Sequence, residues 1–277
     1  MPGTSKLTMG LLHAFLILFG IIWIYPFVWT VFSSLKTNTE MINAGIKLLP
    51  GKAQWGNYVR AWHEANFSGF FSNTVIITVS SVLLVVAMCA LQGYALGRVN
   101  FPGRKWLVAA ITATMFIPKG YTLLPVYIII KQLGLLSSLP GVILAESSGA
   151  HVLFILLFMA YFNKLPMELE EAAEIDGSGF VRTFARVMLP LAKPMIATTA
   201  IMQFIWAWNA FLIPLVFTLS KPELQTLAVG MFTFVGEHSI DWVGMCAGAT
   251  ISLIPVIVVF VALQKYFIEG VAGSIKG

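Results

Sequence analysis

Long apolar runs, separated by short polar segments, dominate the chain. Six of them are long enough to cross a hydrocarbon core about 30 Å thick, which needs about 20 residues of α-helix. The six runs cover residues 9–33, 70–97, 106–127, 141–162, 195–218 and 243–267. The pattern therefore predicts an all-α polytopic membrane protein with six transmembrane helices.

The composition supports a membrane location. Hydrophobic residues make up 58% of the chain and charged residues only 10%, whereas a soluble domain carries about 25% charged residues. The first apolar run has no clear small-residue cleavage site, so we expect a retained helix and no signal peptide. The basic residues behind the net charge of +5 lie mainly at the ends of apolar runs, which is typical of membrane flanks and weak evidence for nucleic acid.

Basic residues also set the expected orientation. Arg98, Arg104 and Lys105 crowd into the short turn after the second run, and such a turn is costly to translocate. If this turn is cytoplasmic, both termini and the segment 163–194 are cytoplasmic as well.

We expect the whole chain, residues 1–277, to form a single transmembrane domain. The loop after the first helix is long enough to form a small structured cap outside the membrane. The expected parts are a first helix with an extracytoplasmic loop at 1–69, a core bundle at 70–267 that carries the cytoplasmic segment 163–194, and a C-terminal tail at 268–277.

The segment 163–194, called the acidic loop below, is the most informative polar stretch. Five of the chain's twelve acidic residues lie between Glu168 and Asp176. Carboxylates favour the first turns of a helix, and Gly177 is suited to end that helix. A second, amphipathic helix is expected after it, capped by Ser178. A short helix with a small-residue face and an acidic edge indicates a docking surface; an ordinary solvated loop is the simpler alternative.

The spacing within this loop is specific. The chain reads Glu171-Ala172-Ala173, three residues, Gly177, nine residues, Val187, one residue, and Leu189-Pro190. This order resembles the EAA motif of membrane subunits of ABC importers. Val187 stands where that family usually has Ile, which is a mild departure.

Four further segments resemble the carbohydrate-uptake branch of these importers, and in particular the G-type permease of maltose transporters. One of them departs from the family pattern, because Ala210 stands where Glu is common. The segments are Phe101-Pro102-Gly103-Arg104; Pro118, Pro125, Tyr127 and Leu133-Gly134-Leu135; Trp208-Asn209-Ala210-Phe211-Leu212; and Gln264-Lys265-Tyr266-Phe267 with the ending Ile275-Lys276-Gly277.

The resemblance implies the type I ABC importer permease fold in the bacterial cytoplasmic membrane. It implies a non-catalytic subunit of an ATP-driven importer for a sugar or oligosaccharide, with no cofactor in this chain. The implied partners are a second, homologous permease in a heterodimer, two cytoplasmic ATPase subunits that bind ATP and Mg, and an extracytoplasmic solute-binding protein.

The resemblance also assigns roles to residues. Glu171 would meet a basic residue of one ATPase, Ala172 and Ala173 would allow close packing, and Gly177 would set the turn, with Leu189 and Pro190 completing the motif. The tail would reach between the two ATPases as a thin, extended segment that contains Gly273, Lys276 and Gly277.

Polar residues inside the spans are candidates for a translocation path, since intramembrane charge is expensive and usually functional. Glu146 and Ser147 lie early in the fourth run and either line a polar path or form the wet outer mouth of the bundle. Asn209 either lines the path or hydrogen-bonds between helices. Trp206 and Trp208 either stack on a sugar ring or pack against neighbouring spans.

Other classes of protein fit less well. The chain has no Gly-x-x-x-x-Gly-Lys-Ser/Thr segment, so it is not expected to bind ATP through a P-loop. An intramembrane serine enzyme would need Gly177-Ser178-Gly179 as its nucleophile turn, but no histidine is near this segment in sequence. The four histidines also lack the spacing of a metal site. A secondary transporter would need ion-coupling carboxylates near the membrane midplane, and Glu146, early in its run, is the only acidic residue clearly within a span. An amino-acid or metal importer with the same loop is the nearest alternative, and the sugar-branch segments argue against it.

Overall fold

The computed structural model describes residues 6–43, 47–63, 66–148, 151–236 and 240–275. All secondary-structure elements assigned within these ranges are helices, as the apolar pattern predicts. The chain divides into two compact units. The first unit comprises residues 1–68 and 230–254, and the second comprises residues 69–229 and 255–277. The expectation of one domain stays a prediction.

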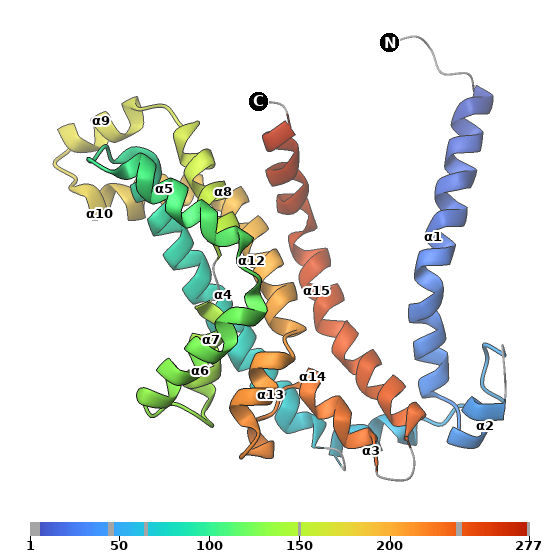
Figure 1. Ribbon diagram of the computed structural model, residues 1–277. Helices are drawn as coiled ribbons and strands as arrows, with labels where there is room; N and C mark the ends of the chain where they lie inside the picture. The colour runs from blue at the N-terminus through green and yellow to red at the C-terminus, as the bar shows by residue number, and fades with distance from the viewer. Residues whose placement is uncertain (1–5, 44–46, 64–65, 149–150, 237–239, 276–277) are drawn as a thin grey trace. The chain divides into compact units, whose positions relative to one another are not determined.

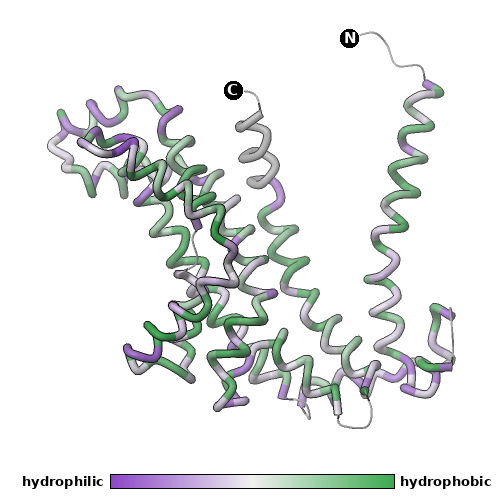
Figure 2. Tube along the Cα trace, viewed as in Figure 1, coloured by the Kyte–Doolittle hydropathy of each residue, from purple (hydrophilic) through white to green (hydrophobic). Residues whose placement is uncertain are grey.

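Among the residues that the structure describes, three helices are long and apolar enough to cross a membrane. They are α1 (Lys6–Ser34), α4 (Phe67–Arg98) and α15 (Trp242–Ile275) (Figure 1). They coincide with the first, second and sixth predicted runs. Figure 2 shows hydrophobic residues along most of α1 and α4.

The third predicted run is not one straight helix. Helix α5 (Arg104–Ala113) and helix α6 (Leu123–Gln132) belong to two segments that meet at an angle of 101°. The short turns η1 (Thr114–Phe116) and η2 (Lys119–Thr122) lie between them. Pro118 causes the break, because proline disfavours helical backbone in the residue before it, and that residue is extended with ψ of 118°.

The fourth run is bent as well. Helices α7 (Leu139–Ser147) and α8 (Val152–Asn163) meet at 58°. The four-residue sequence between them includes Gly149, and glycine is a poor helix former.

The fifth run is interrupted at residues 209–211. Helix α12 (Lys193–Trp208) is followed after a short break by α13 (Leu212–Thr218), and a 79° bend separates α12 from the acidic loop. Counting each bent pair as one span gives up to six spans in the described residues.

The expectation of an extended C-terminal tail was wrong. Helix α15 continues to Ile275, so residues 268–275 are helical and not extended. Gly270 and Gly273 each cost about 1 kcal/mol in a helix, but such a cost does not stop a helix that is already propagating.

The remaining elements are α2 (Asn38–Asn43), α3 (Gly56–His63), α9 (Glu168–Ile175), α10 (Phe180–Thr183), η3 (Phe184–Met188), α11 (Leu189–Leu191), η4 (Pro222–Leu224), α14 (Leu227–Gly230) and η5 (Met231–Phe234).

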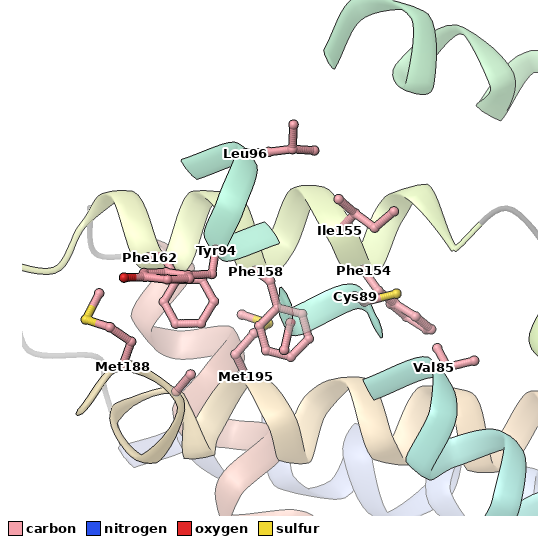
Figure 3. Close-up of a cluster of buried hydrophobic side chains, with 12 residues drawn as sticks. Val85, Cys89, Tyr94, Leu96, Phe154, Ile155, Phe158, Phe162, Met188 and Met195 are labelled. Carbon is pink, nitrogen blue, oxygen red and sulfur yellow. The ribbon is translucent and has the colours of Figure 1, made fainter. Parts of the chain in front are cut away.

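The core of the second unit joins α4, α8, η3 and α12. Phe154, Phe158 and Phe162 recur every four residues on one face of α8 and are fully buried (Figure 3). They pack with Val85, Cys89, Ala90, Tyr94, Leu96, Ile155, Met188, Ala192 and Met195.

Helices α4 and α8 approach closely at Gly93. A Cβ atom at this position would overlap the Cβ of Phe158 and would lie 2.9 Å from the backbone nitrogen of Met159. Gly97, one turn later, is less tight: its Cβ would lie 3.2 Å from the Met159 carbonyl oxygen. Small residues four apart allow two membrane helices to touch through their backbones. This glycine pair was not among the residues predicted from the sequence.

Hydrogen bonds tie together the loop segments of the first unit, which we call the cap; that the cap lies outside the membrane stays a prediction. The carboxylate of Asp241 accepts hydrogen bonds from the Asn38 side chain at 2.9 Å and from the Gly244 N–H at 2.9 Å, and it pairs with Arg60. The Asn57 amide donates to the carbonyls of Ser34 and Lys36 at 2.8 and 2.9 Å. These contacts join α2, α3 and the start of α15.

The Asp241 contacts predict acid sensitivity of this cap. Burial alone would raise the pKa of Asp241, but the hydrogen bonds from Arg60, Gly244 and Asn38 and the charge of Arg60 outweigh it and lower the pKa. The stabilisation is therefore complete above the ordinary carboxyl pKa near 4 and is lost as the pH falls through the lower folded value.

We expect Asp241→Asn at neutral pH to speed amide hydrogen exchange in α2 and α3 about tenfold, since a hydrogen bond to a charged group contributes about 1.5 kcal/mol. Acidification below pH 4 should produce the same loosening in the unmodified protein and little more in the variant. A variant that keeps the full pH response of exchange would show that another group controls it.

Candidate functional site

Helix α9 forms the EAA segment of the acidic loop. Glu168, Glu170 and Glu171 occupy its first turn, where they favour the positive helix end. Gly177 ends it in a left-handed conformation with φ of 76°, donating its N–H to Glu174 O at 2.9 Å, while the next N–H reaches the Ala173 carbonyl oxygen at 2.9 Å. The following helix, α10, is capped by Gly179 and not by Ser178, so that expectation was wrong.

The residues of α9 divide between two faces. Glu170 and Ala173 face the rest of the second unit, with Ala173 only 7% exposed. Glu171 and Ala172 are exposed. The two alanines therefore do not share one docking face: Ala173 lets α9 pack on its own chain, and Ala172 keeps the outer face small.

Arg98, the last residue of α4, anchors the inner face. Its Nε lies 3.2 Å from the Glu170 carboxylate, and the two side chains are only 7% and 13% exposed. The same guanidinium donates to the carbonyls of Leu165 at 2.8 Å and Pro166 at 3.0 Å. One side chain thus fixes both the entry to α9 and its first turn. From the sequence, Arg98 was predicted only to help set the membrane orientation.

Aromatic stacking holds the second half of the loop. The Tyr94 ring stacks on Phe180 and Phe184 with centroids 4.9 and 5.2 Å apart. Leu189 packs against the buried core, whereas Pro190 is exposed at the start of α11. The π-helical turn η3 lies between these contacts, and such turns are frequent at functional sites. The acidic loop is therefore held firmly on α4.

The outer side of the loop combines carboxylates with exposed apolar groups. Ile175 is 87% exposed, and Met167 and Val181 are also largely exposed. Glu171 and Glu174 are exposed beside them. Exposed apolar side chains bordered by charge are typical of a protein interaction surface.

A second feature is a cavity of about 460 Å³ where three helix breaks meet. We call it the broken-helix cavity. It is bounded by the start of the second half of the third run, the end of α7, and the break between α12 and α13. The lining residues are Gly120, Leu123, Glu146, Ile205, Trp206, Asn209, Ala210, Phe211, Leu212 and Ile213. Non-helical backbone inside a membrane is tolerated where it lines such a cavity.

The cavity brings together only some of the path candidates. Glu146 and Asn209 both line it. The Asn209 amide donates to Ile205 O at 2.8 Å within its own helix, which differs from a bond between helices. Trp208 is buried between Phe71 and Phe204, with centroids 6.0 and 5.3 Å away, so it packs and does not line the cavity.

Trp206 supplies the aromatic wall of the cavity instead. Its ring stacks on Phe154 at 5.1 Å. Ser147 is not among the lining residues, and its buried Oγ has no hydrogen-bond partner among the described residues.

Of the tail candidates, Gly273 lies in α15, while Lys276 and Gly277 lie outside the described residues.

Comparison with known proteins identifies the class. Residues 90–273 match the family described as binding-protein-dependent transport system inner membrane component. The chain belongs to this family, and it is a multi-pass protein of the cytoplasmic membrane. Members are the non-catalytic permease subunits of ABC transporters, in which separate subunits hydrolyse ATP, so the intramembrane enzyme is excluded.

Individual relatives define the branch. The chain is 33% identical to the diacetylchitobiose uptake system permease protein NgcG of Streptomyces coelicolor, over 95% of this chain and 86% of that protein. It is 30% identical to the trehalose/maltose transport system permease protein MalG of Thermococcus litoralis, over 94% of each.

A solved structure shows the same fold. The chain is similar to a chain of a bacterial ABC transporter involved in the import of the acidic polysaccharide alginate. The TM-score is 0.82 at 25% identity, and the match covers 96% of this chain and all of that one. The expected type I permease fold of the carbohydrate branch is confirmed.

Proposed function

We propose that this permease subunit imports a sugar or oligosaccharide, and that it does so as a heterodimer with a second, homologous permease. Two cytoplasmic ATPase subunits, which bind ATP and Mg, drive it, and an extracytoplasmic binding protein delivers the solute. The observation that carries this proposal is the rigidly anchored α9 with an exposed acidic and apolar outer face. The relatives for a chitin disaccharide and for trehalose and maltose support the substrate class.

In this proposal both termini and the acidic loop are cytoplasmic. The three basic residues of the turn between Arg98 and Lys105 support this orientation. The broken-helix cavity forms part of the translocation path, where Glu146 and Asn209 offer hydrogen-bonding groups to hydroxyls and Trp206 offers an apolar wall to a sugar ring.

The outer face of α9 transmits the motion. When ATP binding closes the ATPases, a helix seated on one of them moves as a rigid body and carries α4 with it through Arg98. Glu171, on the outer face, pairs with a basic group of the ATPase, and the exposed Ile175 fills an apolar contact. The last residues, including Gly273, Lys276 and Gly277, reach between the two ATPases.

Substrate class is tested by ATP-dependent uptake into proteoliposomes that hold the intact complex and its binding protein. We expect uptake of a labelled disaccharide or oligosaccharide, and no uptake when ATP is replaced by an ion gradient. Uptake of amino acids in place of sugars would overturn the substrate class, and uptake driven by the gradient alone would overturn the mechanism.

Glu171→Lys is expected to lower ATP-driven uptake at least tenfold, because it replaces an attractive charge pair at a desolvated contact with a repulsive one, and such reversals cost several kcal/mol. The variant should still insert and fold, since the Glu171 side chain is exposed. The measurement is uptake together with ATP hydrolysis in proteoliposomes.

Glu223→Lys is the matched control. It makes the same charge change at an exposed position of η4, away from α9. Its uptake should stay near that of the unmodified protein. Equal uptake by Glu171→Lys and the control would remove Glu171 from the coupling role.

A further inference from the structure

A second cavity, which the transport mechanism does not use, lies at the turn between α4 and α5. It measures about 850 Å³ and is lined by residues 100–106, Val108 and Met159. We call it the basic-turn pocket. Two of its lining residues, Arg104 and Lys105, are cationic, and none of the described residues that line it is acidic. The pocket therefore attracts an anion.

Local hydrogen bonds hold the charged end of the pocket in place. The Arg104 guanidinium donates to Asn100 Oδ1 at 2.9 Å and to Gly97 O at 2.9 Å. A guanidinium has five N–H donors, so donors remain after these two bonds. Lys105, the next residue, is exposed. The pocket thus presents one cation held by hydrogen bonds and one exposed cation, next to each other in sequence.

The other side of the pocket is apolar. Trp106 is 82% exposed, and Val108 and Met159 line the same cavity. Along α5, Leu107 is exposed, as is Phe116 in the turn that follows. Figure 2 shows the hydrophilic start of α5 giving way to a hydrophobic stretch. A ligand for this site must be anionic at one end and apolar at the other.

From this arrangement we infer that the basic-turn pocket binds the headgroup of an anionic phospholipid, such as phosphatidylglycerol. The lipid phosphate lies between Arg104 and Lys105, Trp106 lies at the headgroup level where aromatic side chains are favoured, and an acyl chain follows the exposed apolar face of α5. The inference requires only that the chain spans the membrane, and it does not depend on the transported solute or on the role of α9.

A free phosphate could satisfy the two cations, but it would leave the tryptophan and the apolar wall without a partner. The lipid satisfies both parts of the pocket. The two sources are separated by comparing a lipid with its soluble headgroup.

The test is native mass spectrometry of the complex that the full chain forms, titrated with phosphatidylglycerol or phosphatidylcholine. Phosphatidylglycerol should bind at least about fivefold more tightly, since one basic residue near an anionic surface contributes about 1 kcal/mol. Lys105→Gln should weaken phosphatidylglycerol binding about fivefold and leave phosphatidylcholine binding unchanged. Lys164→Gln, at an exposed basic residue outside the pocket, should change neither.

Arg104→Lys separates charge from local structure. It keeps the cation but loses the paired bonds to Asn100 and Gly97, so most of the lipid preference should remain. Equal binding of the two lipids, or unchanged binding by Lys105→Gln, would overturn the inference. Displacement of the lipid by millimolar glycerol phosphate would also overturn it, because the site would then take a soluble anion. None of these results bears on sugar uptake, so the transport proposal is tested separately.

Discussion

Gly93→Ala is expected to prevent stable folding, although it adds a single methyl group. The new Cβ would overlap the Cβ of Phe158 and lie within 2.9 to 3.0 Å of backbone atoms of α8, which cannot rotate away. Overpacking in a core usually costs about 1–3 kcal/mol, and a clash with backbone lies at or above the upper end. The yield of monodisperse full-length protein and its melting temperature, measured by fluorescence-detected gel filtration, should both fall sharply.

Two other glycines complete a graded series. Gly97→Ala meets the Met159 carbonyl oxygen at 3.2 Å and the movable Asn163 side chain at 3.3 Å, so we expect a smaller loss. Gly20→Ala in α1 meets nothing within 4 Å and should be neutral or slightly stabilising, because alanine favours helix. If all three variants melted together, the close crossing of α4 and α8 would not control stability.

Arg98→Met is expected to give the second large effect. It leaves the Glu170 carboxylate almost buried without its cation and removes the bonds that hold Leu165 and Pro166. Removing one partner of a buried ion pair typically costs about 3–5 kcal/mol. The acidic loop should detach locally from α4, which hydrogen exchange of residues 165–178 would reveal, and uptake should fall with it.

The double variant Arg98→Met with Glu170→Leu tests the cause. Replacing both members of a buried pair by apolar groups is often close to neutral, so part of the lost stability should return. The bonds to the two carbonyls stay lost, which limits the recovery. A double variant as unstable as Arg98→Met alone would show that those carbonyl bonds, and not the ion pair, anchor the loop.

The sequence predicted the long helices well because their apolar runs are continuous. Residues 9–33, 70–97 and 243–267 correspond to α1, α4 and α15. It predicted the end of α9 correctly, because Gly177 is suited to a left-handed backbone. It missed the breaks, since hydropathy averaged over 20 residues does not register a local bend. Pro118 was a sequence signal for the first of these helix breaks.

Side-chain direction was harder to predict. Glu170 and Glu171 are neighbours of equal chemistry, and only packing against Arg98 decides which one turns inward. Trp206 and Trp208 likewise differ by two positions on one helix, so one lines the broken-helix cavity and the other is buried. The close approach at Gly93 depends on a partner helix some 65 residues away in sequence, which no local pattern contains.

The two-faced character of α9 bears on how such permeases diversify. Glu170 and Ala173 pack against their own chain, whereas Glu171, Ala172, Glu174 and Ile175 are exposed. If the outer face docks on an ATPase as proposed, substitutions at the exposed positions can suit a different ATPase while the inner ones preserve the fold. A graft of the outer residues alone, from a homologue served by another ATPase, would then transfer motor choice without rebuilding the fold.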